Sequence, residues 1–434
     1  MIGDRAARLV RWRRSVNWLV AAATFALACP AIAQAPSDRA QALFDKVKDS
    51  LLTVRLLIKS SQAQHVIGSG FVVSADGLVI TNFHVISDLA YHPERYSGQY
   101  RRNDGSTGVV EIVDIDVVND LAVLRTDITN SEFLTLKDVR LSKGQSLFSL
   151  GNPLNLGLTV VEGTFSGVVE DSRHGQLHFS GAINPGMSGG PVLLPDGSVV
   201  GINVSRHGFG ELVSFLVPAS SAIKLISATR HAKPAPAFAL NERIRDQIRA
   251  DQQAALEPIV ANPWPSTKLG HYAVPDKPNR FVTCWGSTMD EKKILYVSTI
   301  HGCQTRDWIY IGQGRVTGYM RFSHTHFASK GLGWARFYKL VESSFSSSHY
   351  ERGDLEDQTE FRCHDDFVDS AGRTMRAVLC LRAYKKLQGL YDLRLKMVSL
   401  DSSSDAVLSD LDVSGATYET AIAVARKNLT SITW

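Results

Sequence analysis

One serine stands among glycines in the segment from residue 182 to residue 191, whose sequence is AINPGMSGGP. Glycine reaches positive φ at little steric cost and lets other groups approach the backbone closely. A turn of this kind can direct several amide N–H groups at one point, as the stabilisation of a developing oxyanion requires. The segment therefore marks Ser188 as a candidate nucleophile and restricts the fold to those that can present such a turn.

A histidine and an aspartate precede this serine in the chain. His84 follows two short apolar strands predicted within 68–85 and joined by an Asp-Gly turn, and Asp120 stands directly before the apolar run LAVL. The segment around Ser188 fits the G-x-S-x-G elbow of α/β-hydrolases as well as the serine loop of chymotrypsin-like proteases. An α/β-hydrolase, however, has the order Ser, Asp, His and alternates strands with helices. The order His, Asp, Ser excludes that arrangement.

Several longer segments, in the same order along the chain, resemble the HtrA/Deg group of chymotrypsin-fold serine proteases. They are GSGFVVSADGLVITNFHV, DLAVL, LGNPLNLGLTVVEGTFSGV, INPGMSGGPVL and GSVVGIN. The resemblance covers roughly residues 40–225 and implies an all-β double barrel of the chymotrypsin-like type. It also implies His84 as general base, Asp120 as the orienting carboxylate and Ser188 as nucleophile, with the amides of Gly186 and Ser188 as the oxyanion hole.

The residue types agree with that chemistry. Serine is a poor nucleophile near neutral pH, so an imidazole must accept its proton and a carboxylate must hold the imidazole. The implied activity is peptide-bond hydrolysis through an acyl-enzyme, with no cofactor and no metal, in a protein quality control role. Met187 departs from the family, which has Asn there, and methionine lacks the hydrogen bonds of that side chain. The alternative is therefore a catalytically weak or inactive protease-like binding or scaffold protein.

The resemblance also implies a primary specificity pocket. Ala182, six residues before the nucleophile, is expected at its base, with Gly201, Ile202 and Asn203 along one wall. None of these residues is a carboxylate, so a lysine or arginine side chain would be buried without a partner, whereas a small apolar one gains from burial. We expect cleavage after small or apolar residues in unfolded or extended segments. Asn203 can add a polar contact.

The N-terminal segment has the organisation of a secretory signal peptide. Five arginines between residues 5 and 14 precede an apolar stretch from Trp18 to Ala28, and Ala31-Ile32-Ala33 is a small-x-small cleavage site. The apolar stretch is too short to span a bilayer comfortably. We predict a signal peptide at 1–33, no stable membrane span after its removal, and a periplasmic or extracellular location in a bacterium.

Composition limits the partners. The formal net charge of +4 is small for 434 residues, and part of it belongs to the leader, so we expect no nucleic-acid partner. The hydrophobic content of 44% with 21% charged residues is typical of soluble globular proteins, and the length allows two or three domains. The expected partners are protein or peptide substrates. The sequence does not decide between a monomer and a homo-oligomer.

Four cysteines remain after the leader, namely Cys284, Cys303, Cys363 and Cys380. In an oxidising compartment an even set predicts two disulfides, and four cysteines allow three pairings. Short sequence separation favours Cys284 with Cys303 and Cys363 with Cys380. Four reduced buried thiols are the alternative, and a zinc site is less expected because the spacings contain no C-x₂-C pair.

The chain is predicted to have three parts after the leader. They are a trypsin-like serine protease domain at 34–230, a Pro-rich and helical linker at 231–267, and a disulfide-bearing, β-rich α+β domain of unknown role at 268–434, without a recognisable PDZ pattern. The linker is predicted to hold a helix over 242–256, after which Pro258, Pro263 and Pro265 break the chain. In the last part the patterns predict strands at 280–284, 293–297, 374–384 and 390–400 and a helix at 418–428.

Two groups of side chains in this last part have more than one interpretation. Five aromatic residues either line a recognition groove or belong to the core, and they are Trp285, Trp308, Tyr310, Tyr319 and Trp334. His324 and His326 are spaced like metal ligands on one strand face, but no third ligand is evident. We expect these two histidines to be an exposed polar pair.

Overall fold

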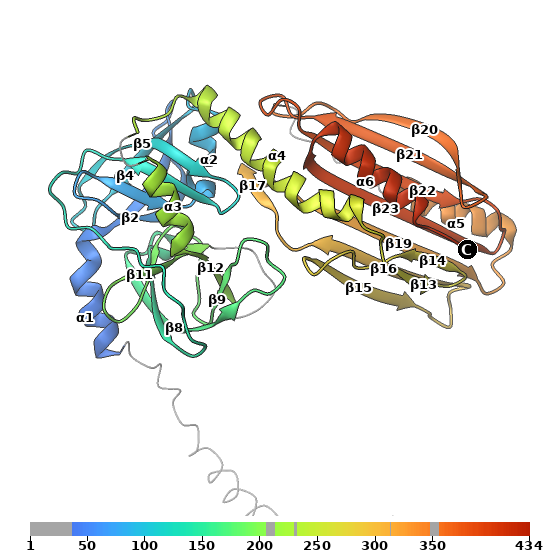
Figure 1. The fold of residues 1–434 in the computed structure, drawn as a ribbon, viewed down its shortest axis with the longest axis horizontal. Coiled ribbons are helices and arrows are strands. Elements are labelled where there is room, and N and C mark those ends of the chain that lie inside the picture. Colours follow the sequence, from blue (N-terminus) through green and yellow to red (C-terminus); the bar gives the residue numbers. More distant parts are fainter. Residues whose placement is uncertain (1–36, 205–212, 230–231, 313, 348–355) are drawn as a thin grey trace, which may run out of the picture. The chain divides into compact units, whose positions relative to one another are not determined.

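A computed structural model of the chain (Figure 1) describes residues 37–204, 213–229, 232–312, 314–347 and 356–434. Residues 38–434 form one compact unit. The predicted signal peptide at 1–33 lies outside the described residues. Among the helices that are described, none is both long enough and apolar enough to cross a membrane.

Two closed antiparallel barrels of six strands each make up the first half of the unit, in the chymotrypsin-like arrangement expected from the sequence. The strands of the first barrel are β1 (Leu51–Ile58), β2 (Gln64–Val72), β3 (Leu78–Thr81), β4 (Tyr96–Arg101), β5 (Thr107–Asp116) and β6 (Leu121–Arg125). Those of the second are β7 (Ser146–Gly151), β8 (Thr159–Val168), β9 (Leu177–Phe179), β10 (Pro191–Leu193), β11 (Val199–Val204) and β12 (Ser214–Pro218).

Successive side chains of a barrel strand point to opposite faces, and in these barrels both faces are buried in apolar clusters. On β1, Leu52 and Val54 point into the cluster that fills the first barrel, whereas Leu51 belongs to a second cluster. That second cluster joins Phe71 of the first barrel to Phe148 of the second. Because the loops that follow β3, precede β6 and precede β10 meet where the barrels join, residues far apart in sequence can form one site there.

Six α-helices are described along the chain, together with short 3₁₀ turns at Lys48–Ser50 and Pro153–Asn155. The helices are α1 (Asp38–Val47), α2 (Phe83–Tyr91), α3 (Ala219–Thr229), α4 (Ala237–Ala261), α5 (Trp334–Ser347) and α6 (Tyr418–Thr430). The helix predicted over 242–256 therefore begins earlier, at Ala237, and continues past Pro258, which corrects that expectation. Ile259 is almost fully buried against the C-terminal sheet, and this packing offsets the N–H that proline lacks.

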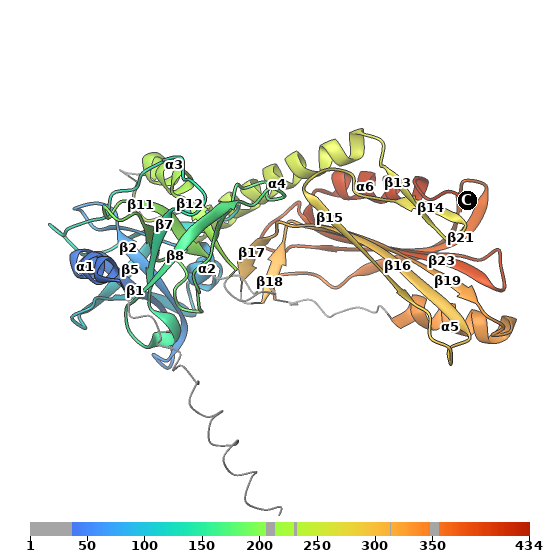
Figure 2. The same cartoon turned by 90° about the horizontal axis from the view of Figure 1, so that it is seen from below.

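The C-terminal part is built on a seven-stranded antiparallel sheet in the order β15-β16-β19-β23-β22-β21-β20. Its strands are β15 (Val282–Met289), β16 (Tyr296–Thr305), β19 (Met320–Ser329), β20 (Arg362–Ser370), β21 (Arg373–Ala383), β22 (Tyr391–Ser399) and β23 (Asp405–Ala416). Two hairpins accompany it, β13 (Ser266–Leu269) with β14 (Tyr272–Pro275) and β17 (Ile309–Gly312) with β18 (Arg315–Thr317). Helices α4 and α6 cover one face and α5 packs on the other, as Figure 2 shows.

Each edge strand of this sheet is joined to its neighbour by a disulfide. Cys284 on β15 is bonded to Cys303 on β16, and Cys363 on β20 is bonded to Cys380 on β21. In both pairs the cysteines lie directly opposite each other in the ladder. The pairing favoured by sequence separation is therefore the one in the structure, and it fastens both edges of the sheet.

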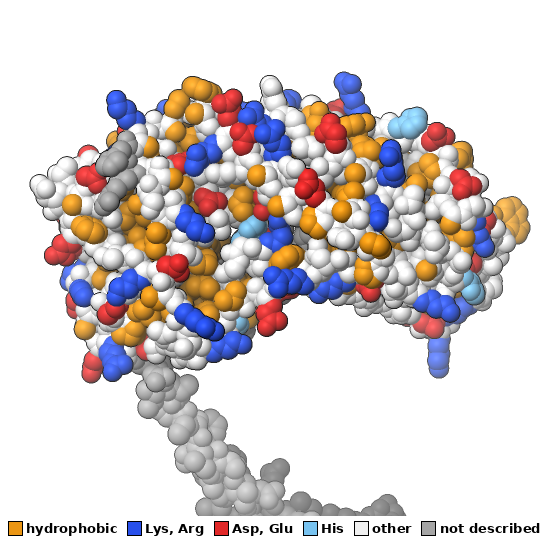
Figure 3. All heavy atoms as spheres, in the orientation of Figure 1, with side chains coloured by type: hydrophobic (Ala, Val, Ile, Leu, Met, Phe, Trp, Pro, Cys, Tyr) orange, Lys and Arg blue, Asp and Glu red, His pale blue; other side chains and the backbone are white. Residues whose placement is uncertain are grey.

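Most of the predicted C-terminal elements are confirmed, with shifted ends. β21, β22 and α6 match the expected strands and helix, and β21 and β22 pair as the expected hairpin. The strand expected from Lys293 begins later, at Tyr296, because Ile294 N–H donates to the carbonyl of Glu291 in a turn. Lysine, arginine, aspartate and glutamate side chains are interspersed over the face seen in Figure 3, in keeping with the small net charge.

The expectation of an exposed histidine pair is wrong. His324 is completely buried and His326 is 8% exposed, because β19 lies inside the sheet, between β16 and β23. His326 Nε2 lies 2.7 Å from a carboxylate oxygen of Asp405. Of the five aromatic residues, Trp285 and Trp334 are 44% and 69% exposed, so the core interpretation is wrong for these two. Trp308, Tyr310 and Tyr319 are half-buried.

Candidate active site

His84 is held at the start of α2 by the carboxylate of Asp120. Asn82 is the extended residue before the helix, so His84 lies in its first turn, where backbone N–H groups lack helical partners. Asp120 Oδ1 accepts the backbone N–H of His84 at 2.9 Å, and Oδ2 lies 2.7 Å from the imidazole Nδ1. One carboxylate therefore both caps the helix and orients the ring.

The backbone of Asp120 is in the left-handed region, with φ of 56°. Aspartate is one of the few residues with a side chain that tolerate this conformation. The carbonyl of Asp120 accepts from Asn82 Nδ2 at 2.7 Å and from Phe83 N–H at 3.2 Å. Asp120, in the turn before β6, is thus hydrogen-bonded to the segment of His84 both by its backbone carbonyl and by its side chain.

The loop that carries Ser188 requires its glycines. Gly186 has φ of 97°, and a Cβ there would lie 2.3 Å from the carbonyl oxygen of Asn152. Gly189 has φ of 83°, and a Cβ there would lie 2.3 Å from the carbonyl oxygen of Ser69. Met187 between them is completely buried, so this loop is fixed by packing and backbone hydrogen bonds.

Ser69 on β2 is a supporting residue that the sequence reasoning missed. Its N–H donates to the carbonyl of Ser188 at 2.7 Å, and its hydroxyl donates to the carbonyl of Gly186 at 2.7 Å. The same hydroxyl accepts the N–H of Asn152 at 2.9 Å. The available signal was its place between two glycines in the segment GSG, where a polar residue interrupts an apolar strand.

The segments that carry His84 and Ser188 meet at Gly68. A Cβ at this glycine would lie 2.5 Å from the side chain of Val85, the neighbour of His84, and 3.2 Å from the carbonyl oxygen of Ser188. The backbone of β2 at Gly68 therefore lies directly between the segment of His84 and the loop of Ser188. The structure brings His84, Asp120 and Ser188 into one region where the two barrels join.

The expected pocket residues lie on β11 and in the loop before Ser188. Gly201, Ile202 and Asn203 are buried on β11, and Ala182 is half-buried. Asn203 donates from Nδ2 to the carbonyls of Leu150 and Met187, and its Oδ1 accepts the hydroxyl of Ser149. Because these bonds use both N–H donors of its amide, Asn203 supports the serine loop.

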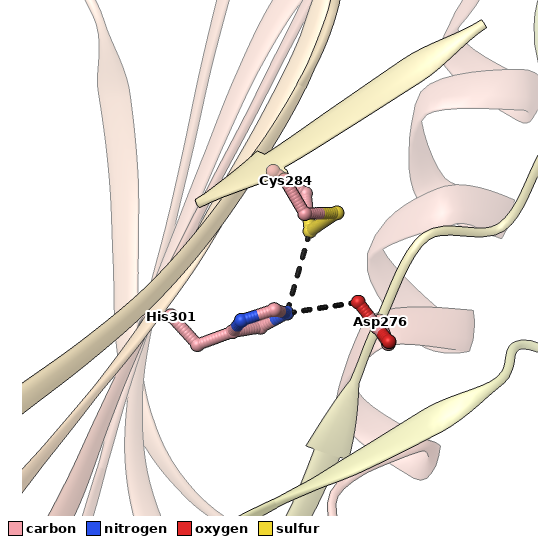
Figure 4. The surroundings of a disulfide bond; sticks show 4 residues. Asp276, Cys284 and His301 are labelled. Atoms are coloured by element: carbon pink, nitrogen blue, oxygen red, sulfur yellow. Dashed lines mark hydrogen bonds and ion pairs between the residues drawn. A yellow bond between two sulfur atoms is a disulfide. The ribbon is translucent and has the colours of Figure 1, made fainter. Parts of the chain in front are cut away.

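A separate group of polar side chains surrounds the disulfide at the β15 edge (Figure 4). His301 Nε2 lies 3.1 Å from Asp276 Oδ1 and 3.5 Å from Cys303 Sγ. The ligand atoms of Asp276, Cys284, His301 and Cys303 lie within 4.8 Å of one another. The two sulfur atoms are bonded to each other, so in this state neither is a thiolate that could bind a metal.

The C-terminal sheet also has a hollow of about 840 Å³, lined by residues from Trp285 onward and by none from the barrels. Its walls carry paired charges, since Arg321 and Arg394 both lie within ion-pair distance of Asp412. Burial raises the pKa of Asp410, on the same strand, to about 6. Trp285 thus lines a recess, as the groove interpretation of the aromatic residues expects.

The barrel region matches known proteases. Residues 68–202 match the family model described as a trypsin-like peptidase domain. A probable periplasmic serine endoprotease, DegP-like, from Chlamydia muridarum is 34% identical over 181 residues, which are 39% of this chain and 34% of that protein. The putative serine protease HhoB from Synechocystis is 32% identical over 164 residues, 36% of this chain and 38% of that protein.

The likeness is limited to part of each protein. The chain spans little more than a third of the length of these curated relatives. The crystal structure of the serine endoprotease from Yersinia pestis is 28% identical, covers 45% of this chain and 68% of its own, and superimposes with a TM-score of 0.39. The resemblance to HtrA-type serine proteases is confirmed for the barrel region.

Proposed function

We propose that this chain, whose barrel region is a trypsin-like peptidase domain of the HtrA type, is an exported serine endopeptidase with His84, Asp120 and Ser188 as its catalytic triad. The observation that carries the proposal is the 2.7 Å contact between His84 Nδ1 and Asp120 Oδ2, beside a serine loop that needs glycine at positions 186 and 189. A carboxylate in that position selects the tautomer in which Nε2 can accept a proton.

In the proposed mechanism Ser188 Oγ attacks the carbonyl carbon of the scissile peptide bond while His84 Nε2 takes the hydroxyl proton. The N–H groups of Gly186 and Ser188 donate to the oxyanion that forms. Collapse of this intermediate expels the amine, which takes the proton from His84, and leaves Ser188 acylated. A water molecule then repeats the sequence, again with His84 as base, and releases the acid and free serine. Asp120 remains ionised throughout and stabilises the imidazolium.

The proposed substrates are unfolded or extended segments cleaved after small or apolar residues. Ala182 is half-buried and Ile202 is buried, and none of the four pocket candidates is an acid that could pair with a lysine or arginine. A buried cation without a partner is strongly disfavoured. The amide of Asn203 is already bonded within the protein, which leaves apolar surface as the basis of selection.

Export to the periplasm is part of the proposal. The first 33 residues have the organisation of a signal peptide, and the relative from Chlamydia muridarum is described as periplasmic. The two disulfides also suit an oxidising compartment. Mass determination of the mature protein, with an N-terminus expected near Gln34, tests this part separately.

The alternative, a protease-like scaffold without activity, rests on Met187. The buried Met187 N–H donates to the carbonyl of Asn184 at 3.0 Å, and its carbonyl accepts from Gly190 N–H at 3.0 Å. These bonds come from the backbone and do not need an asparagine side chain. They favour a competent loop and hence the enzyme over the scaffold.

Labelling with a fluorophosphonate probe tests the activity. We expect the wild-type protein to be labelled at Ser188 and to degrade an unfolded protein, and Ser188→Ala to do neither while keeping its melting temperature. His84→Ala should retain the serine and lose labelling. Wild-type protein that is neither labelled nor active would favour the scaffold.

A further inference from the structure

The β17–β18 hairpin of the C-terminal part packs against α2, the helix that begins at the candidate catalytic histidine (Figures 1 and 2). Ile309 and Ile311 of β17 are almost fully buried in the same apolar cluster as Phe83 and Ile86 of α2. Because side chains alternate along a strand, Tyr310 points away from its two isoleucine neighbours. The backbone that carries Tyr310 is thus anchored by a buried residue on either side of it in the sequence.

Tyr310 touches His84. The two ring centroids are 5.7 Å apart with an angle of 68° between the planes, which is an edge-to-face contact. Burial, together with the nearby carboxylates of Asp88 and Asp120, raises the pKa of Tyr310 to about 12, so its hydroxyl stays neutral at physiological pH. The contact that Tyr310 makes with His84 is therefore between an uncharged phenol ring and the imidazole.

The residues just before Tyr310 are tied to the other barrel. Asp307 is 3% exposed and accepts from the hydroxyl of Ser172 at 3.1 Å and from the N–H of Arg173 at 2.6 Å. Both partners lie in the loop between β8 and β9 of the second barrel. The segment from Asp307 to Tyr310 thus contacts the second barrel, which carries Ser188, at one end and His84 of the first barrel at the other.

We propose that the segment Asp307–Tyr310 braces the two barrels across the active site, and that Tyr310 is a positioning residue that holds the imidazole of His84 in its catalytic orientation. The inference rests on the proposed function. The proposed mechanism requires Nδ1 on Asp120, as in the structure, and Nε2 directed at Ser188. A ring packed edge-on against the imidazole restricts its rotation to other staggered conformations. Without that contact the ring would spend less time in the productive orientation, which lowers turnover more than substrate binding.

The test compares Tyr310→Ala, Tyr310→Leu and Tyr310→Phe in the full chain. Tyr338→Ala serves as a matched control, because Tyr338 lies on α5 and is 43% exposed. Titration with the fluorophosphonate counts competent sites, and kcat and KM for an unfolded-protein substrate are then expressed per titrated site. Melting temperatures report folding separately.

We expect Tyr310→Ala to lower kcat per site about tenfold with KM within about threefold of wild type. Tyr310→Leu, which keeps apolar bulk and protects folding, should also lower kcat, whereas Tyr310→Phe and Tyr338→Ala should match wild type. Unchanged kcat per site in both Tyr310→Ala and Tyr310→Leu would overturn the inference. A variant with fewer sites labelled by the fluorophosphonate, but with wild-type kcat at each labelled site, would overturn it as well. A Phe variant as impaired as the Ala variant would also overturn it. If the wild-type protein itself is not labelled, the failure lies with the proposed function.

Discussion

The hydroxyl of Ser69 donates a 2.7 Å hydrogen bond to the carbonyl oxygen of Gly186, and so links a strand of the first barrel to the serine loop of the second. With its N–H on the carbonyl of Ser188, Ser69 holds this loop on both sides of Met187. The orientation of the peptide group after Gly186 therefore depends on a residue outside the proposed triad.

Ser69→Ala should impair catalysis without abolishing it. The substitution leaves the buried carbonyl of Gly186 and the N–H of Asn152 without the hydroxyl, so the loop can relax and weaken the proposed oxyanion hole. We expect kcat to fall roughly tenfold to a thousandfold, the upper limit being the loss of a whole oxyanion donor. Ser227→Ala, at an exposed site on α3, is the control and should leave kcat unchanged. Wild-type kcat in Ser69→Ala would contradict the proposed role of this hydroxyl.

Asp120→Asn should abolish most activity while preserving the fold. Asparagine tolerates the left-handed backbone at this position. Its amide, however, has one oxygen where the carboxylate has two, so it cannot accept from both the backbone N–H and the ring of His84. We expect kcat to fall by about 10³ to 10⁴. Asp76→Asn, in the exposed turn before β3, should behave like wild type in the same assay.

The cut sites in a denatured protein should lie mainly after Val, Ala, Ile or Leu. None of the four pocket candidates is an acid, and Ala182 and Ile202 offer apolar surface. Burial of a small aliphatic side chain gains roughly 1.5 to 3 kcal/mol. Mass spectrometric mapping of a digest, with Ser188→Ala as the blank, gives the distribution. A majority of cuts after lysine or arginine would refute this specificity.

Loss of a disulfide should loosen one edge of the C-terminal sheet. The Cys284–Cys303 and Cys363–Cys380 bonds span 19 and 17 residues, and closing loops of that size is worth about 3 kcal/mol. We expect the paired substitution Cys284→Ser with Cys303→Ser to lower the melting temperature and to increase hydrogen exchange in β15. Exchange in β20, held by the other disulfide, should be unchanged and provides the internal control.

His324 should make the fold acid-sensitive. Burial lowers its pKa to about 3, with a further contribution from His301, and neither ring nitrogen has a hydrogen-bond partner among the described residues. An unfolded histidine titrates near 6.5, so between about pH 6.5 and 3 the unfolded chain binds a proton that the folded chain does not. The stability present above pH 6.5 is therefore lost as the pH falls, by up to about 1.4 kcal/mol per unit.

The variant His324→Leu removes this titration. We expect the difference in melting temperature between neutral and mildly acidic buffer to be smaller in His324→Leu than in wild type. His364→Leu, whose side chain is 80% exposed, should leave the difference as it is. An unchanged acid response in His324→Leu would show that the proton uptake occurs elsewhere.

The sequence predicted the structure best where residues close together in the chain determine it. The strand patterns around His84 and Asp120 predicted their places at the ends of β3 and β6, and short separation predicted both disulfides. Burial that depends on the whole sheet could not be predicted in this way. His324 has a polar neighbour on either side in the sequence, which predicts exposure, yet it is completely buried on a strand that lies between β16 and β23.

The sequence pattern likewise could not predict contacts between segments that are far apart in the chain. Tyr310 and His84 are separated by more than half of the chain, and no periodicity in β17 indicates which helix it will meet. The role of Ser69 needed the positions of Gly186 and Asn152, which belong to other strands and loops. Pocket residues such as Asn203 were placed by resemblance alone, and only the structure shows where its amide is bonded.

The apolar cluster around α2 has a consequence for how such a chain can change over time. Leu240 and Ile244 of α4 and Ile309 of β17 are buried in it together with Phe83, so the cluster is continuous from the first barrel into the C-terminal half. If recombination replaced the C-terminal half, the apolar side chains of α2 beside His84 would lose the residues that cover them. We therefore expect the two halves to evolve together, with each restricting the substitutions that the other can accept.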